Sequence, residues 1–293
     1  GTEYLRLQEA FDDINAGNLQ GEIILQIIDD CNETGTAVIY PSGYLGNSYY
    51  SSITIYPTGS GYTISGSING PLVELNGAAN IIFDGRVNQS GNADLIISNT
   101  NTGTSASTIQ FSESANNNIV QYCIVKGSGT GSSTGVIFFS TASSGNGNDD
   151  NTIDNNFITG NTTDRPVNSL YSAGTSGSEN SGNVISNNKF YNFLNTGLES
   201  SGIYLSSYTT SITVSGNSFY ESSSLVPTAS TDWYFIRVNN TSGTGFSISG
   251  NFIGGNTSSC GGTAFTKSNE YDNVFWGIFI NAGTGTASSL QDN

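Results

Sequence analysis

Apolar residues near the start of the chain are spaced like one face of an α-helix. Four of them recur at i, i+3, i+4 and i+7: Leu7, Ala10, Phe11 and Ile14. Gly17 follows, and glycine is often found just beyond the last turn of a helix. The pattern predicts an amphipathic helix over 4–16. Within an N-terminal segment 1–20, this helix would cap the open end of an apolar core; the alternative is an ordinary surface helix.

From Gly21 onward the apolar residues fall into short runs separated by Gly, Asn, Pro and Ser, which is the pattern of short β-strands. The early runs are 22–29, 52–56, 62–68, 72–75 and 81–83. A second kind of run occurs at 135–140, 202–205, 234–238 and 274–280. These runs predict an all-β chain, either an antiparallel sandwich or barrel or a parallel β-helix.

One unit, an apolar residue followed three places later by asparagine, recurs in the C-terminal half. Its five copies are Ile153/Asn156, Ile185/Asn188, Val214/Asn217, Ile248/Asn251 and Leu290/Asn293. The asparagines are 32, 29, 34 and 42 residues apart. Equivalent residues of a parallel coil lie above one another, about 4.8 Å apart, whereas a sandwich has no reason to repeat this offset. The repeat therefore favours a right-handed parallel β-helix over 21–293, with about eight or nine coils at roughly 30 to 35 residues each.

Asparagine suits a bend in such a coil because its amide can donate to and accept from the amides above and below. The residues that precede the five asparagines also accept tight turns: Asn155, Asn187, Gly216, Gly250 and Asp292. Earlier in the chain, Val120 leads to Cys123 and Ile82 leads to Gly85 at the same offset. We therefore expect an internal asparagine ladder, with Cys123 as a buried thiol in one of its positions.

A phenylalanine follows four of these asparagines by one or two places. These residues are Phe157, Phe190, Phe219 and Phe252. We expect them to form an aromatic row inside the coil, on the face of the preceding Ile or Val. The alternative is an aromatic platform that binds carbohydrate.

Composition and charge narrow the possible partners of the 293-residue chain. Its net charge of −16, with seven scattered basic residues, argues against nucleic acid and anionic membranes. No apolar run approaches the roughly 20 residues of a membrane span, so we expect no membrane insertion. The chain starts at Gly1, shows no signal peptide and contains no methionine, so we expect a processed product or an excised segment, as secretion would yield.

Histidine and cysteine limit the chemistry further. The chain has no histidine, which excludes a serine–histidine triad or a histidine-bearing metal site within it. Cys31, Cys123 and Cys260 are far apart and match no zinc spacing. They are expected to be small buried thiols, with at most one disulfide among them.

Two regions resemble large secreted β-helix proteins of Bacteroidetes-type bacteria, which share the fold of the pectin-lyase superfamily. The N-terminal run "YLRLQEAFDDINAGNLQGEIILQI" looks like their helix and first strand, and the run from "ISGNFIGGN" to "SSLQDN" is similar to their coils. The resemblance implies export, a cell-surface or extracellular location and a longer polypeptide. It carries over no catalytic residue. Because "SSLQDN" opens another repeat unit, we expect further coils or stacking onto another subunit.

The candidate chemistry lies in the acidic loop 145–156. Hydrolases of this fold use clustered aspartates as acid and base, and the nearest cluster here is Asp149, Asp150 and Asp154. The polygalacturonase pattern also needs a histidine and an Arg-x-Lys element, and both are absent. Lyases of this fold need a basic residue beside calcium-binding carboxylates, and the late candidates are Arg165, Lys189, Arg237 and Lys267. No cofactor is expected, although the loop oxygens suit calcium.

The sequence thus favours a non-catalytic extracellular module with a structural or adhesive role. Its expected partners are copies of itself, stacked end to end into a filament, or extracellular glycans. The alternative is a calcium-dependent polysaccharide lyase or a glycoside hydrolase of the same fold.

Overall fold

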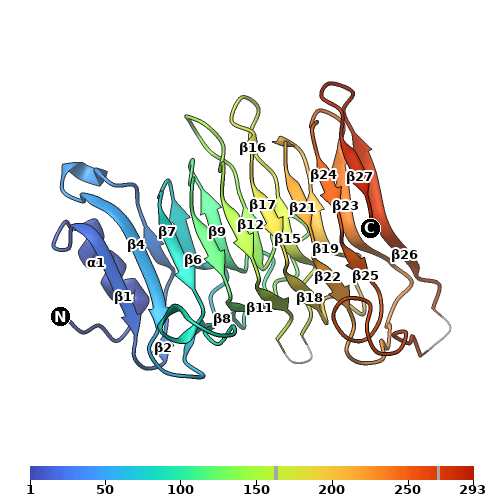
Figure 1. The fold of residues 1–293 in the computed structure, drawn as a ribbon, viewed down its shortest axis with the longest axis horizontal. Coiled ribbons are helices and arrows are strands. Elements are labelled where there is room, and N and C mark those ends of the chain that lie inside the picture. The colour runs from blue at the N-terminus through green and yellow to red at the C-terminus, as the bar shows by residue number, and fades with distance from the viewer. Residues whose placement is uncertain (162–163, 269–270) are drawn as a thin grey trace.

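The computed structural model describes residues 1–161, 164–268 and 271–293. In these residues the chain winds into a stack of turns in which successive turns pair as parallel strands (Figure 1). Each turn contributes strands to three long sheets, which we name sheets A, B and C. The predicted all-β parallel β-helix with one short N-terminal helix is thereby confirmed.

The strands follow one another in chain order within each sheet. Sheet A contains β1 (Gly21–Ile27), β4 (Tyr50–Pro57), β7 (Ile81–Asp84), β10 (Ile119–Gln121), β13 (Thr152–Asp154), β17 (Val184–Ser186), β21 (Thr213–Ser215), β24 (Ser247–Ser249) and β27 (Ser289–Gln291). Sheet B contains β2 (Cys31–Asn32), β5 (Thr63–Gly66), β8 (Ile96–Asn99), β11 (Ile124–Gly127), β14 (Phe157–Thr159), β18 (Lys189–Tyr191), β22 (Ser218–Tyr220) and β25 (Phe252–Ile253).

The third sheet carries the longest strands of the later turns. Sheet C contains β3 (Ala37–Ile39), β6 (Pro71–Asn76), β9 (Ser107–Ser112), β12 (Ile137–Phe139), β15 (Asn168–Ser172), β19 (Ser200–Leu205), β23 (Asp232–Asn240) and β26 (Val274–Ala282). The remaining elements are α1 (Leu7–Asn15), the short strands β16 (Asn180–Ser181) and β20 (Thr209–Thr210), and the 3-10 turns η1 (Tyr44–Gly46) and η2 (Val87–Gln89).

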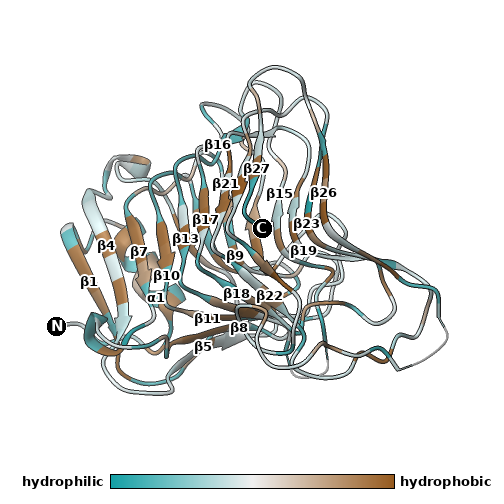
Figure 2. Ribbon diagram, turned by 45° about the vertical axis from the view of Figure 1, so that its right-hand side comes forward, coloured by the Kyte–Doolittle hydropathy of each residue, from teal (hydrophilic) through white to brown (hydrophobic). Residues whose placement is uncertain are grey.

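Alternation along the strands places one apolar residue of each turn directly above its counterpart. In sheet A, Ile153 pairs with Val120 of the turn before and with Ile185 of the turn after, and all three are almost completely buried. Brown segments recur on successive strands of this sheet in Figure 2. Because each such side chain contributes about 1.5–3 kcal/mol when buried, the core grows with every turn.

The predicted asparagine ladder is present. The backbone N–H and the Nδ2 of Asn156 both donate to Oδ1 of Asn188, at 2.9 and 3.0 Å. The same pair of bonds joins each later asparagine to the next, ending at Asn293. The residues before the five asparagines all have left-handed φ, between 53° and 65°. Cys123 is fully buried, and its N–H donates to Oδ1 of Asn156, which confirms its predicted position.

The ladder position predicted at Gly85, three residues after Ile82, is shifted by one residue from the register of the strands. Strand pairing aligns Phe83 with Val120, so Ile82 is not the counterpart of that residue. Gly85 nevertheless lies against the bend at Cys123, because a Cβ on Gly85 would come within 2.7 Å of the Cys123 Cα atom. A side chain at Gly85 would therefore clash with the turn above it.

Two further asparagine ladders, which we did not predict, run beside the first. In the second ladder, Asn118 donates to Oδ1 of Asn151, and Asn151 donates to Oδ1 of Asn183. In the third, Asn148 donates to Oδ1 of Asn180. All five side chains are buried, so each ladder supplies partners to amides that water does not reach.

The predicted inward phenylalanine row is only half correct. Phe190 and Phe219 are fully buried, and their rings stack with centroids 4.8 Å apart. Phe157 and Phe252 instead point away from the core, and Phe252 is 43% exposed. They follow their asparagines by one residue rather than two, so strand alternation turns them outward, and Ile158 occupies the inward position beside Phe190.

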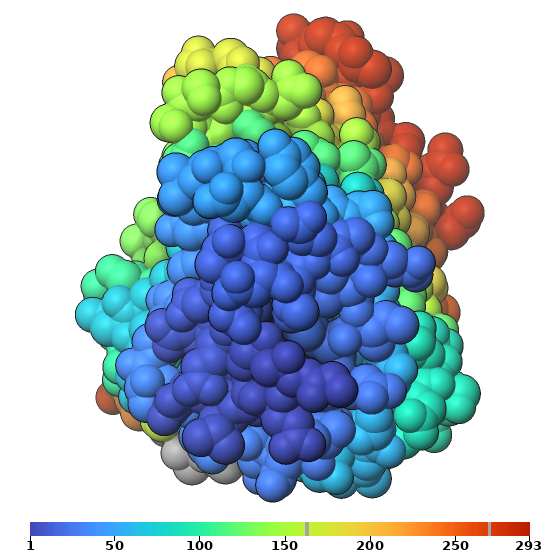
Figure 3. Space-filling model, turned by 90° about the vertical axis from the view of Figure 1, so that its left-hand side faces the viewer, coloured from blue at the N-terminus to red at the C-terminus, as the bar shows by residue number. Residues whose placement is uncertain are grey.

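The N-terminal helix covers the first turn with the predicted apolar face. Leu7, Phe11 and Ile14 are buried in the same core as the strands. Viewed along the stack in Figure 3, the N-terminal residues cover this end. The carboxylate of Glu33 accepts from the N–H groups of Leu7, at 2.7 Å, and Gln8, at 3.1 Å, so a residue of the first turn caps the helix.

The other end of the stack has a different surface. In Figure 1, β26 and β27 lie at the end opposite α1. Ile280 and Leu290 occupy inward positions but remain 38% and 52% exposed. Their counterparts in the preceding turn, Val238 and Ile248, are fully buried. The last described turn therefore leaves core positions open to solvent.

Candidate functional site

The two half-buried aspartates of the acidic loop are bound to the next turn of the coil. Oδ1 of Asp149 accepts from the N–H and the hydroxyl of Ser181, at 2.8 and 3.0 Å. Oδ1 of Asp154 accepts from the hydroxyl of Ser186, at 2.6 Å, and from Nδ2 of Asn187, at 2.9 Å. Burial raises the pKa of Asp149, and its bonds to Ser181 oppose that shift. Both carboxylates thus brace neighbouring turns.

Asp150 serves as a turn residue. It is exposed, has a left-handed φ of 56°, and its N–H donates to the carbonyl of Ser181 at 3.0 Å. Across the described residues, no three carboxylate or thiol side chains come close enough to hold a metal ion. The loop 145–156 therefore does not bring its aspartates together as a calcium site.

Two of the four basic candidates contact groups other than these aspartates. Arg165 forms an ion pair with Glu221, which is completely buried and also accepts from the N–H groups of Phe193 and Leu194, each at 3.0 Å. Burial raises the pKa of Glu221, and Arg165 opposes that shift. Lys189 lies on sheet B with its ammonium 4.3 Å from the ring centroid of Phe157. Among the described residues, neither cation forms an ion pair with Asp149, Asp150 or Asp154.

The other two basic candidates lie in the last turns. Lys267 donates to the backbone carbonyl of Tyr271. Arg237, on β23, forms an ion pair with Glu199 at 2.5 Å. Its guanidinium lies 4.4 Å from the ring centroid of Tyr204 and 4.2 Å from that of Tyr234. Arg237 is therefore part of an aromatic array on the outer face of sheet C.

This array follows the strand register from turn to turn. We name its members the sheet C outer row: Phe138, Tyr171, Tyr204, Arg237 and Phe279. The rings of Tyr171 and Tyr204 meet edge to face with centroids 5.2 Å apart. Tyr234 and Trp276 lie beside the row, stacked at 6.0 Å with an interplanar angle of 7°. The row forms an ordered outward surface across several turns.

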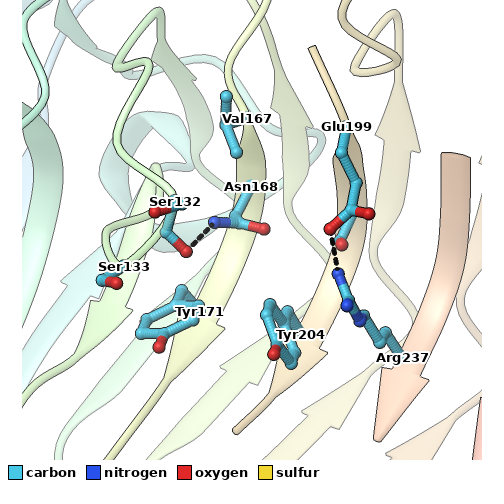
Figure 4. Close-up of a pocket in the computed structure, with 9 residues that line it drawn as sticks. Ser132, Ser133, Val167, Asn168, Tyr171, Glu199, Tyr204 and Arg237 are labelled. Atoms are coloured by element: carbon cyan, nitrogen blue, oxygen red, sulfur yellow. Dashed lines mark hydrogen bonds and ion pairs between the residues drawn. The ribbon is translucent and has the colours of Figure 1, made fainter. Parts of the chain in front are cut away.

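Three members of the row, Tyr171, Tyr204 and Arg237, line a groove, which we name the sheet C groove, with a volume of about 260 Å³. Its remaining lining comes from polar residues of neighbouring loops and strands: Ser132, Ser133, Asn168, Glu199 and Ser201, with Val167. Figure 4 shows Tyr171 and Tyr204 side by side below Asn168, while Glu199 faces Arg237. The groove therefore combines hydroxyl, amide and charged groups beside aromatic rings.

Sequence reasoning missed this groove, although a signal was present. In three successive turns of sheet C an inward apolar residue precedes an outward aromatic one: Ile137/Phe138, Leu170/Tyr171 and Ile203/Tyr204. In the pairing of β15 with β19 and of β19 with β23, one residue of each strand has no partner in the register: Ser169, Gly202 and Phe235. Phe235 and Ile236 are consequently both buried in the core, and simple alternation does not predict that Tyr234 lies outside.

The three cysteines are free thiols. Cys123 is buried as predicted, and burial strongly raises its pKa. Cys31 is partly buried, and its pKa is raised to about 11, chiefly by burial. Cys260 is exposed, so the expectation of buried thiols is wrong there.

Comparisons with protein families, curated proteins and solved structures find no match to this chain. The fold and the groove define a parallel β-helix with an ordered outer face, and kinship with a particular group of secreted proteins has no support from these comparisons. Among the described residues, no helix has the length and apolarity needed to cross a lipid bilayer.

Proposed function

We propose that this protein is a non-catalytic structural and adhesive β-helix module, located outside the cell and bound to glycans through sheet C. The main support for this proposal is that the acidic residues considered for catalysis are bonded within the coil. Asp149 and Asp154 bond to the next turn, and Glu221 is buried against Arg165. A general acid or base must reach the group whose proton it moves, and these carboxylates are committed to the scaffold.

The sheet C outer row supports the adhesive part of the proposal. Its side chains are fixed by stacking from one turn to the next, so little ordering remains to be done when a ligand binds. The extracellular location is proposed from the sequence alone, on the resemblance of the terminal segments to secreted β-helix proteins.

A combined binding and degradation assay tests this proposal. The full chain is applied to a panel of neutral and acidic polysaccharides, in the presence of calcium and in the presence of a chelator, while polymer length is followed by size-exclusion chromatography. We expect retention on at least one polymer with no change in its length. Shortening that disappears in Asp149→Asn or Asp154→Asn would instead establish the alternative, a polysaccharide lyase or glycoside hydrolase.

A further inference from the structure

We infer that the sheet C groove binds an uncharged saccharide through hydrogen bonds to its hydroxyl groups and to the amide oxygen of Asn168, whose Nδ2 already donates to backbone carbonyls. This inference rests on the proposed adhesive function and names the ligand of that face. The geometry points to one sugar unit seated in the groove, with the rest of its chain lying over the outer row.

The hydroxyls of the exposed Ser133 and the partly exposed Tyr204 are open to a ligand, whereas Tyr171 and Ser201 line the groove but are only 6% and 1% exposed. Within the described part of the chain, no side-chain or backbone group hydrogen-bonds the hydroxyls of Tyr171, Tyr204, Ser133 or Ser201. Each hydroxyl can both donate and accept, which matches the hydroxyls of a sugar. Groups that are ordered by the scaffold but lack internal partners form a prepared polar surface.

The tyrosines of the groove can bind a ligand more readily through their hydroxyls than through their ring faces. Arg237 covers one face of Tyr204, and Tyr171 meets that ring nearly at right angles, 83°. Because these contacts occupy the rings, we expect recognition through hydrogen bonds along the ring edges. Removing one phenolic hydroxyl should therefore weaken binding without disturbing the array.

Charge favours an uncharged ligand. The cation of Arg237 is paired with Glu199 inside the groove, so the site has no free positive charge to attract a carboxylate. The chain as a whole carries a net charge of −16, which repels polyanions. An uncharged sugar needs no free cation and is not repelled by the negative chain, and its hydroxyls can hydrogen-bond to Glu199 and Arg237.

Size limits the occupant to a small unit. The groove volume of about 260 Å³ is below the roughly 300 Å³ at which pockets for drug-sized molecules begin. Beyond the groove, Trp276 is 39% exposed and stacks on the buried Tyr234, so a longer chain has an ordered aromatic surface there.

The test compares two tyrosine-to-phenylalanine variants of the full chain. Tyr204→Phe keeps the ring of a groove residue and removes only its hydroxyl. Tyr191→Phe is the matched control, since Tyr191 stacks on Tyr220 at 5.4 Å in sheet B, away from the groove. Affinity electrophoresis through β-glucan, mannan, xylan and galactan, with polygalacturonate as the acidic polymer, gives the dissociation constants, and thermal unfolding checks that both variants fold.

We expect at least one neutral polymer to retard the wild type at both low and high salt. Tyr204→Phe should raise the dissociation constant about five- to tenfold, and Tyr191→Phe should leave it unchanged. Equal losses in both variants, an intact affinity in Tyr204→Phe, or binding to polygalacturonate alone would overturn the inference. A neutral polymer bound independently of Tyr204 would still support the adhesive function, whereas no binding to any polymer would overturn both.

Discussion

The side chain of Asn188 shows how a single buried amide joins three turns. Its Oδ1 accepts from the N–H and Nδ2 of Asn156, and its Nδ2 donates to Oδ1 of Asn217, at 3.0 Å, and to the carbonyl of Ile153, at 2.8 Å. Every hydrogen-bonding group of this amide is satisfied without water. A fully satisfied polar network can specify register as well as stabilise, because any shift would leave buried groups unpaired.

Asn188→Ala should therefore be strongly destabilising. It leaves two buried donors of Asn156 without an acceptor, and we expect the free energy of unfolding to fall by about 2–4 kcal/mol. Urea denaturation measures this change. Asn146→Ala is the control, because Asn146 is exposed and, among the described residues, only its backbone carbonyl is hydrogen-bonded. Equal effects of the two substitutions would contradict the role given to the ladder.

Breaking the Arg165–Glu221 pair should cost even more. Glu221→Gln leaves the Arg165 guanidinium, only 11% exposed, without its counter-ion, and loss of one partner of a buried pair typically costs about 3–5 kcal/mol. Glu199→Gln breaks the more exposed pair with Arg237 and should cost about 1 kcal/mol or less. Denaturation midpoints at neutral pH compare the two variants, and a larger loss in Glu199→Gln would refute this ranking.

Asp149 provides a test of pH dependence. Burial raises its pKa in the folded state, so folding favours its protonated form. Its contribution to stability is complete below the unfolded pKa of about 3.9 and is lost as the pH rises through the folded value. The stability of the wild type relative to Asp149→Asn should therefore decline as the pH rises from about 3 toward neutrality. A difference that grows with pH would show that the bonds to Ser181 outweigh burial.

At the scale of elements, sequence patterns predicted the helix and most strands, because helical and strand periodicities are local properties. The helix was expected over 4–16 and forms over Leu7–Asn15, with the expected buried face. The capping by Glu33 was not predictable, since that carboxylate reaches the helix only after the first turn closes. Phe157 was wrongly predicted to point inward. It follows its asparagine by one residue, not two, and a shift of one residue along a strand turns the side chain to the opposite face of the sheet.

The ladders show the same limit on prediction. The main ladder repeats in five turns and stands out in the sequence. Asn118, Asn151 and Asn183 lie five places before the main-ladder positions, but Ile212 and Phe246 replace them in later turns and remain buried. A position that is polar in some turns and apolar in others leaves little sequence signal. The sheet C groove was hidden for a further reason, because its residues meet only when loops and strands of different turns stack.

The end of the helix offers a test at this scale. Gly17 has a φ of 81°, and a Cβ there would come 2.3 Å from the carbonyl oxygen of Asn47. Gly21 has a φ of 79° but open space around it, so Gly21→Ala adds only the backbone strain, about 1–2 kcal/mol. Gly17→Ala should lower the unfolding temperature further, because it also displaces the neighbouring loop. Equal shifts in thermal unfolding would show that the contact with Asn47 is unimportant.

At the scale of the whole molecule, the two ends of the stack differ in what they present to solvent. Helix α1 buries its apolar face over the first turn. The last described turn exposes Phe275, Trp276, Ile280 and Leu290 by between 37% and 52%. Exposed apolar strand edges promote pairing with other chains. We therefore expect end-to-end association to involve the turn that contains β26 and β27.

Leu290→Lys tests this expectation directly. Leu290 continues the buried row of Ile248 at an open position, so a charged side chain there should oppose the burial of that turn against a second chain. We expect analytical ultracentrifugation to show concentration-dependent association of the wild type and weaker association of Leu290→Lys. Leu45→Lys is the matched control, because Leu45 is 78% exposed in η1 and lies outside the last turn. A wild type that remains monomeric at high concentration would reject association. Equal effects of the two substitutions would show that the last turn is not the contact surface, because Leu290, unlike Leu45, extends the stacked core.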